Sequence, residues 1–175
     1  HQAMSDPLTG LGNRRWLNER AAEELARSVR QRQPLSLIVL DLDRFKNIND
    51  THGHGVGDNV LVAAGEILKT CLRPYDIAAR IGGEEFCVVL PQTGEAEAAD
   101  IAERIRAAFA AIVVPPLRRG RITASFGICL AEPGDGLQNL LTKGDKALYE
   151  AKRAGRNRVR SAPQAPAKKA EPAVS

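Results

Sequence analysis

Residues 76–90 read DIAARIGGEEFCVVL, two short runs rich in β-forming residues with Gly82, Gly83, Glu84 and Glu85 between them. This pattern predicts a β-hairpin whose tip carries two carboxylates. Glycines at a hairpin tip permit positive φ and let a ligand come close to the backbone. Acidic turns are common, and solvated turn residues are the plain alternative. Neighbouring carboxylates also suit a metal ion held beside a phosphate.

A second acidic pair stands upstream, at the end of a nearly continuous apolar run. Residues 35–42 have the length and composition of a strand buried on both faces, interrupted by Asp41 and followed by Asp43. Side chains two positions apart on a strand share a face, so Asp41 and Asp43 can point the same way. A carboxylate at the end of a buried strand is costly unless it is paired or binds a metal. Asp43 has a second interpretation, as the N-cap of the helix that follows.

The composition is that of one ordinary globular domain. The 175 residues are 43% hydrophobic and 26% charged, and no apolar run approaches the roughly 20 residues of a membrane span. No secretory signal pattern occurs at the start. The formal net charge of +4 suits anionic small ligands as well as nucleic acid and does not distinguish them. Cys71, Cys87 and Cys129 lack metal-like spacing, which favours buried thiols in a reducing cytosol, and His52 and His54 lack further ligands for zinc.

Helical and strand patterns alternate along the rest of the chain. We expect helices from about residue 13, over 45–48, over 56–68, from 101 to 112 and from 137 to 152. Further strands are expected at 122–130 and at 158–159, and a glycine-rich loop at 52–57. Residues 1–5 are expected to be an expression remnant or a linker, and the Ala/Pro-rich residues 161–175 a disordered tail. This order predicts an α+β, ferredoxin-like domain with a mostly antiparallel sheet and helices packed on one face.

Five motifs carry a resemblance to a known family. They are residues 6–15 (DPLTGLGNRR), 41–50 (DLDRFKNIND), 53–58 (GHGVGD), 80–86 (RIGGEEF) and 147–157 (ALYEAKRAGRN). In these motifs and their order the chain resembles the GGDEF domain, the catalytic domain of diguanylate cyclases, in the variant with Glu for Asp. The resemblance covers residues 6–160 and implies the nucleotidyl-cyclase and polymerase-palm relative of the ferredoxin fold.

The resemblance implies condensation of two GTP into cyclic di-GMP and two pyrophosphates. Each of two facing domains holds one GTP, and the 3′-hydroxyl of each GTP attacks the α-phosphate of the other, so catalysis requires a homodimer. The family further implies a cytoplasmic domain without nucleic-acid or membrane contacts. In the full-length protein a sensor or dimerisation domain, which could anchor it to a membrane, is expected to precede this domain. Two other hypotheses are a catalytically silent receptor of cyclic di-GMP and a cyclase with another base preference.

The resemblance assigns the acids and one lysine to metal binding and catalysis. Asp41 and Glu84, with the backbone carbonyl of Leu42, would bind Mg²⁺ or Mn²⁺, which prefer oxygen ligands. Glu84 would also assist deprotonation of the 3′-hydroxyl, a role that a nearby metal ion can share. Lys46 would stabilise charge on the phosphates, and Glu85 completes the catalytic set; alone, Lys46 would be taken for a solvated helix lysine. Degenerate family members lose the acids or the lysine, so their presence here favours an enzyme over a silent receptor.

Five further residues match the family's substrate-binding positions. Lys152 and Arg156 correspond to phosphate contacts on the last helix, although positive charge is favourable at any helix C-terminus. Asn49 and Asp58 correspond to the pair that reads guanine. A carboxylate can accept from N1–H and the exocyclic amine of guanine, a donor pair that adenine lacks, so Asp58 favours GTP. His54 would flank the nucleotide or form only local hydrogen bonds.

A third group resembles the family's inhibitory site for the product. Arg73 and Asp76 form an Arg-x-x-Asp sequence, with Arg73 nine residues before Gly82. At this offset Arg is expected to fork onto phosphate or guanine and Asp to accept from guanine, whereas the pair alone would be taken for a surface ion pair. Arg27 is assigned a further contact. The resemblance implies that the inhibitory and catalytic sites lie on different faces, so cyclic di-GMP would lock the domain arrangement rather than compete with GTP.

Overall fold

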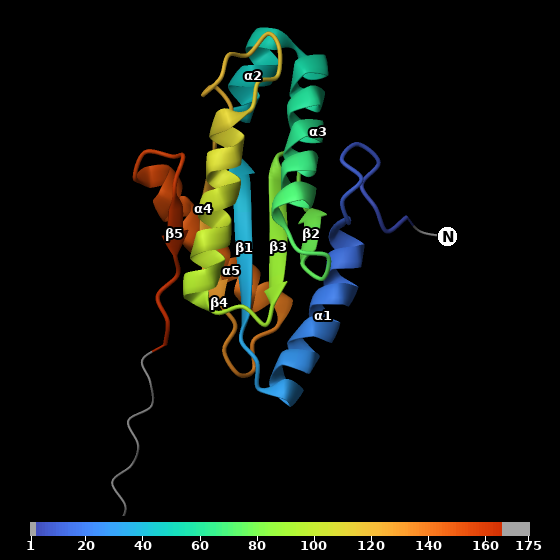
Figure 1. The fold of residues 1–175 in the computed structure, drawn as a ribbon, viewed down its shortest axis with the longest axis vertical. Helices are drawn as coiled ribbons and strands as arrows, with labels where there is room; N and C mark the ends of the chain where they lie inside the picture. Colours follow the sequence, from blue (N-terminus) through green and yellow to red (C-terminus); the bar gives the residue numbers. More distant parts are fainter. Residues whose placement is uncertain (1–2, 166–175) are drawn as a thin grey trace, which may run out of the picture.

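The structure, a computed structural model, describes residues 3–165, which form five helices and five strands (Figure 1). In chain order they are α1 (Arg14–Gln31), β1 (Leu35–Leu42), α2 (Phe45–His52), α3 (His54–Cys71), β2 (Ile77–Arg80), β3 (Glu85–Pro91), α4 (Glu95–Ala111), β4 (Ala124–Leu130), α5 (Leu137–Arg153) and β5 (Val159–Ser161). The predicted strand at 35–42 and the hairpin of β2 and β3 are confirmed.

Strand β1 occupies the centre of a five-stranded sheet of order β2-β3-β1-β4-β5. It pairs antiparallel with β3 and with β4, while β4 and β5 run parallel, so the prediction of a mostly antiparallel sheet is confirmed. Every residue of β1 is buried. The register sets Asp41 opposite Glu85 on one side and Ser125 on the other, which brings the predicted acids to one end of the sheet.

Helices cover both faces of the sheet, which corrects the prediction of helices on one face. The side chains of Ile38 and Leu40 pack with α2, α3 and α4 on the face seen in Figure 1. The side chains of Leu37 and Val39 pack with α1 and α5 on the opposite face. A strand that is apolar without alternation needs cover on both faces, so residues 35–42 already carried this signal.

Two glycines let α5 lie close to β4. A Cβ at Gly127 would stand 2.2 Å from the Gly144 carbonyl oxygen and 2.5 Å from the Leu148 nitrogen. A Cβ at Gly144 would stand 2.9 Å from a methyl group of Val39 on β1. This close packing brings the C-terminal part of α5, which carries Lys152, near the end of the sheet that carries Asp41.

The helix boundaries around residues 43–57 differ from the sequence pattern. The predicted loop at 52–57 is wrong, because α2 ends at His52, α3 begins at His54, and Gly53 alone separates them with a φ of 88°. Glycine adopts this backbone readily, so the chain turns within one residue. The interpretation of Asp43 as the cap of α2 is also wrong, since Arg44 occupies that position without a side-chain hydrogen bond.

Both chain ends of the described region touch the domain. The Met4 carbonyl accepts from the Asn13 N–H (3.1 Å), and Ser5 forms a β-bridge with Gly12. Ser161, the first residue of the predicted tail, ends β5. Residues 1–2 and 166–175, which belong to the predicted remnant and tail, lie outside the described residues. Within residues 3–165, no helix combines the length and the hydropathy needed to cross a membrane.

Candidate active site

The hairpin tip and the end of β1 lie side by side. The Leu42 N–H donates to the Glu84 carbonyl (3.2 Å), and Glu85, at the start of β3, pairs with Asp41 across the ladder. Directly opposed side chains share one face about 5 Å apart, so Asp41 and Glu85 bring two negative charges together. Glu84 is partly buried in the tip and Glu85 is exposed. The structure therefore gathers the four predicted metal and acid positions at one end of the sheet.

Asp41 is the most buried acid of this group, with 5% of its surface exposed. Its Oδ2 accepts from the Lys152 ammonium, whereas its Oδ1 is buried without a hydrogen-bond partner among the described residues. Burial raises the pKa of Asp41; the Lys152 ammonium opposes this rise, and the charges of Glu84 and Glu85 add to it. A buried carboxylate oxygen without a partner is costly, so Asp41 favours a cation in addition to Lys152.

The residues around Asp41 fit a hard divalent cation. The unpartnered Asp41 Oδ1, the Glu84 carboxylate and the Leu42 carbonyl are oxygen donors of the kind that Mg²⁺ and Mn²⁺ prefer. Among residues 3–165, no three His, Cys, Asp or Glu side chains form a cluster that could hold a metal ion. A cation at Asp41 would therefore need further ligands in addition to these protein oxygens, and phosphate oxygens are ligands of that kind.

Gly82 and Gly83 leave room at the tip but do not have an unusual backbone. Neither adopts a positive φ, so this predicted reason for glycine is wrong. A Cβ on Gly83 would meet nothing within 4 Å, and one on Gly82 would come within 3.2 Å of the Glu85 Oε2. The open space at Gly83 is compatible with the second predicted reason for glycine at the tip, which is close approach of a ligand to the backbone.

Arg80 ties the tip to the start of the domain. Its Nε donates to the carbonyls of Gly82 (3.2 Å) and Gly83 (3.0 Å), and its Nη1 donates to Asp6 (3.2 Å). Burial alone would raise the pKa of Asp6. Hydrogen bonds from Thr9 and the positive charge of Arg80 outweigh this effect and hold the pKa of Asp6 below its ordinary value. Both residues lie in the quoted motifs, but sequence reasoning gave neither a role, because a contact across 74 positions leaves no local pattern.

Asn49 of α2 and Gly57 of α3 meet where the two helices diverge from Gly53. A Cβ at Gly57 would stand 1.8 Å from the Asn49 Oδ1, so only glycine leaves Asn49 in its position. This Oδ1 is the second buried polar atom without a partner among the described residues. Asp58, one residue further along α3, is exposed. An unpartnered amide oxygen and an available carboxylate suit a ligand that offers several N–H donors, as guanine does.

Lys46 and His54 stand at the starts of neighbouring helices. Lys46 is the second residue of α2 and His54 the first residue of α3, and both side chains are exposed. His54 therefore lies on a helix and not in the predicted loop. Both residues lie on the two-helix unit that carries Asn49 and Asp58, and Lys46 is five residues beyond Asp41 along the chain.

Asp43 accepts hydrogen bonds that hold the turn containing Arg156 against the end of β1. Its carboxylate accepts from the hydroxyls of Thr123 (2.7 Å) and Ser125 (2.6 Å) and from the Asn157 N–H (3.0 Å). Asp43 thus joins the end of β1, the start of β4 and the turn after α5. Arg156 is partly buried in that turn, with a φ of 64°. Sequence reasoning missed this role, since the three donors come from distant parts of the chain.

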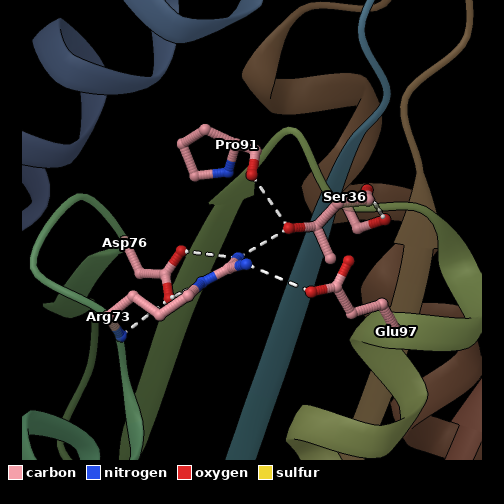
Figure 2. Close-up of polar contacts among 6 residues, drawn as sticks. Ser36, Arg73, Asp76, Pro91 and Glu97 are labelled. Carbon is pink, nitrogen blue, oxygen red and sulfur yellow. Dashed lines mark hydrogen bonds and ion pairs between the residues drawn. The ribbon is translucent and has the colours of Figure 1, made fainter.

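A second polar cluster surrounds Arg73 at the opposite end of β3 from the tip. The Arg73 Nε and Nη2 each donate to one oxygen of Asp76 at 3.0 Å. Figure 2 shows the guanidinium also reaching Glu97 of α4 (3.1 Å). The Arg73 Nη2 donates to the Thr93 hydroxyl as well (2.6 Å). The Tyr75 ring lies 4.8 Å from the guanidinium carbon. The predicted Arg73 and Asp76 therefore form one hydrogen-bonded unit in the turn between α3 and β2, and Glu97 of α4 contacts it.

Arg27 lies on α1, beside the same turn. It pairs with the buried Glu24 (3.2 Å). Together with Tyr75 it lines a pocket of about 210 Å³. The structure thus brings Arg27 near the 73–76 turn, although its ion-pair partner is on its own helix.

The sequence matches the family model for the diguanylate cyclase GGDEF domain over residues 3–158. Diguanylate cyclase DgcP of Pseudomonas aeruginosa is 48% identical over 162 residues, which cover 90% of this chain and 24% of that protein. Diguanylate cyclase DgcM of Escherichia coli is 40% identical over 162 residues, covering 93% of this chain and 39% of that protein. The chain therefore spans less than half the length of these relatives.

Solved structures agree with the sequence matches. The GGDEF domain of DgcB from Caulobacter crescentus, crystallised in complex with c-di-GMP, superposes with a TM-score of 0.86 at 33% identity, covering 92% of this chain and 94% of that one. The active GGEEF domain of a diguanylate cyclase from Vibrio cholerae superposes with a TM-score of 0.79 at 38% identity, covering 87% and 98%. The fold is therefore the nucleotidyl-cyclase palm fold expected from the motifs, and the chain belongs to the GGDEF-domain family of diguanylate cyclases.

Proposed function

We propose that this domain condenses two GTP into cyclic di-GMP and two pyrophosphates. The observation that carries the proposal is the buried, unpartnered Oδ1 of Asp41 beside Lys152 and the two glutamates of the hairpin tip. A buried carboxylate oxygen without a hydrogen-bond partner is unfavourable in the ligand-free protein, and it becomes favourable when a cation and phosphates are bound. Family membership supplies the reaction to which this chemistry belongs.

The guanine of GTP is assigned to the space between α2 and α3. The Asn49 amide oxygen, which lacks a donor among the described residues, accepts from the base, and the exposed Asp58 carboxylate accepts from N1–H and the exocyclic amine. Adenine lacks this donor pair, so unpaired acceptors penalise it. His54 flanks the nucleotide at the start of α3. Specificity for GTP thus comes from two acceptors on adjacent helices.

The charged residues act on the triphosphate and the nucleophile. Lys46, Lys152 and Arg156 neutralise the phosphates, and Lys46 stabilises the charge that grows as the bond to pyrophosphate breaks. Glu84 takes the proton of the 3′-hydroxyl, whose oxygen then forms the new bond to the α-phosphorus of the other GTP, with Glu85 beside it. Asp41, Glu84 and the Leu42 carbonyl would hold Mg²⁺ or Mn²⁺, which would lower the pKa of the 3′-hydroxyl and offset phosphate charge.

Two copies of the domain are needed because each holds one GTP. The 3′-hydroxyl of the GTP on one copy attacks the α-phosphate of the GTP on its partner, and the reverse attack closes the ring. Each attack releases one pyrophosphate. A homodimer, arranged by other parts of a longer protein or by the domains themselves, is therefore the catalytic unit.

The product is proposed to inhibit at the Arg73 cluster. Arg73 and Asp76 present donors and acceptors that suit phosphate and guanine, and Arg27 lies beside the same turn. The DgcB domain from C. crescentus was crystallised in complex with c-di-GMP, which supports product binding by this fold. Because the cluster is at the opposite end of β3 from the hairpin tip, the product would fix the arrangement of the two domains rather than displace GTP.

Incubation with GTP and Mg²⁺, followed by chromatography, tests the proposed function. We expect cyclic di-GMP and two equivalents of pyrophosphate from the wild type. The Glu84→Gln variant should give no product while part of its GTP binding persists. Binding of cyclic di-GMP by a wild type that forms none at high protein concentration would favour the receptor hypothesis instead.

A further inference from the structure

A second pocket, of about 530 Å³, opens on the outer side of α2. Three segments line it: residues 43–52, which run from the turn after β1 through α2, the 116–123 loop that precedes β4, and the 155–157 turn. Figure 1 shows the chain between α4 and β4 lying beside α2 at the top of the view. The lining begins at Asp43, two residues after Asp41, and includes Arg156, so the pocket adjoins the proposed phosphate site.

Four arginines give this pocket its charge. Arg44, Arg118, Arg121 and Arg156 contribute to its lining, and none of their side chains forms an ion pair or hydrogen bond with another described residue. Asp43 is the one carboxylate among the lining residues, and its oxygens already accept from neutral donors. Like charges gathered around one cavity repel each other, and a bound anion removes that repulsion.

The size and chemistry of the pocket indicate the kind of anion. A guanidinium binds phosphate oxygens through two parallel hydrogen bonds, so several arginines suit a ligand with more than one phosphate. The apolar lining is limited to Ile48 and to Pro116 and Leu117 of the loop. Arg156 lines the pocket and is also one of the residues proposed to contact the phosphates of GTP, so the pocket adjoins the place where the proposed reaction would release a diphosphate.

We propose that this pocket is a diphosphate-binding site, in which Arg118 and Arg121 hold the inorganic pyrophosphate released by the reaction. The proposal rests on the proposed function for the source of the ligand. Arg118 and Arg121 are positioned to delay the departure of pyrophosphate, so the enzyme is inhibited by this product at a place separate from the Arg73 cluster.

Binding of sodium pyrophosphate, measured by titration calorimetry without nucleotide or divalent cation, tests the pocket. The double variant Arg118→Gln/Arg121→Gln should bind pyrophosphate about tenfold more weakly than the wild type. Arg119→Gln is the matched control, since Arg119 is exposed in the same loop but does not line the pocket. It should stay within about twofold of the wild type. Lys46 and Lys152 of the proposed phosphate site are unchanged in all three proteins. A difference in pyrophosphate affinity between them therefore reports on Arg118 and Arg121.

Equal affinity in the double variant and in the Arg119→Gln control would overturn the proposal, as would the absence of measurable binding to the wild type. Either result can be distinguished from a failure of the proposed cyclase function, because the titration measures binding and requires no turnover. Inhibition of cyclic di-GMP formation by added pyrophosphate should weaken by the same factor in the double variant. If the double variant forms cyclic di-GMP and its inhibition by pyrophosphate is unchanged, the proposed cyclase function stands and the proposed pyrophosphate site is refuted.

Discussion

Replacing Gly57 by alanine tests the guanine site with a single methyl group. The new Cβ would stand 1.8 Å from the Asn49 Oδ1, 2.9 Å from its Cγ and 3.3 Å from a ring carbon of Phe45. The first two distances are shorter than a carbon atom tolerates, so the Asn49 side chain must rotate away. Asp58, the next residue, keeps its place on α3.

The expected loss is that of one hydrogen bond to the ligand. Leaving a buried donor or acceptor unpaired costs about 1–3 kcal/mol, which corresponds to a Kd for GTP that rises about 5- to 150-fold. Alanine is favoured over glycine in a helix by about 1 kcal/mol, so stability should change little even with Asn49 displaced. The variant is therefore expected to be folded and weak in GTP binding.

Gly55→Ala is the matched control, since a Cβ there would meet nothing within 4 Å on the same helix. Titration calorimetry with GTP in a Glu84→Gln background measures binding without turnover, and thermal unfolding checks both proteins. GTP affinity in Gly57→Ala equal to that in Gly55→Ala would refute the placement of guanine beside Asn49.

Three further predictions concern the product site, the tip and the core. Glu97→Gln should strengthen cyclic di-GMP binding by no more than about fivefold, because the Glu97 side chain is 55% exposed and its charge competes only weakly for Arg73; weaker binding in the variant would contradict this prediction. Asp6→Asn should lower the unfolding free energy by about 1 kcal/mol at pH 7. Because the pKa of Asp6 is depressed by its partners, including Arg80, this difference should vanish as the pH falls through that pKa, and a difference that persists in acid would count against the contact. Gly127→Ala should lower Tm by about 6–12 °C, since backbone atoms block the new methyl and overpacking costs about 3 kcal/mol; an unchanged Tm would exclude that contact.

The sequence predicted those parts of the fold that local patterns encode. The unbroken apolar run at 35–42 became the central strand, and two glycines between β-rich runs became the hairpin. The side of the sheet that each helix covers was not predictable from its own amphipathic stripe, because a stripe requires cover but does not say which surface provides it. Gly53 shows a similar limit, since one residue made the turn for which six were expected.

The candidate site divides in the same way. Asp41, Glu84 and Asn49 were predicted from motifs, and the unpartnered oxygens of Asp41 and Asn49 then emerged from the packing around them. The contacts of Asp43 with Thr123 and of Arg80 with Asp6 were missed, because these partners lie 80 and 74 positions away. Long-range polar contacts depend on the register and on the crossing of strands, which no short stretch of sequence specifies.

The dependence of the rate on protein concentration tests the central claim most directly. If two copies each bring one GTP, cyclic di-GMP formation per domain should rise in proportion to domain concentration until the dimer is complete. Chromatography of timed reactions at saturating GTP and Mg²⁺ measures this rate over a wide dilution series. A rate per domain that is already constant in a protein shown by light scattering to be monomeric, or the absence of cyclic di-GMP at every concentration, would contradict the account.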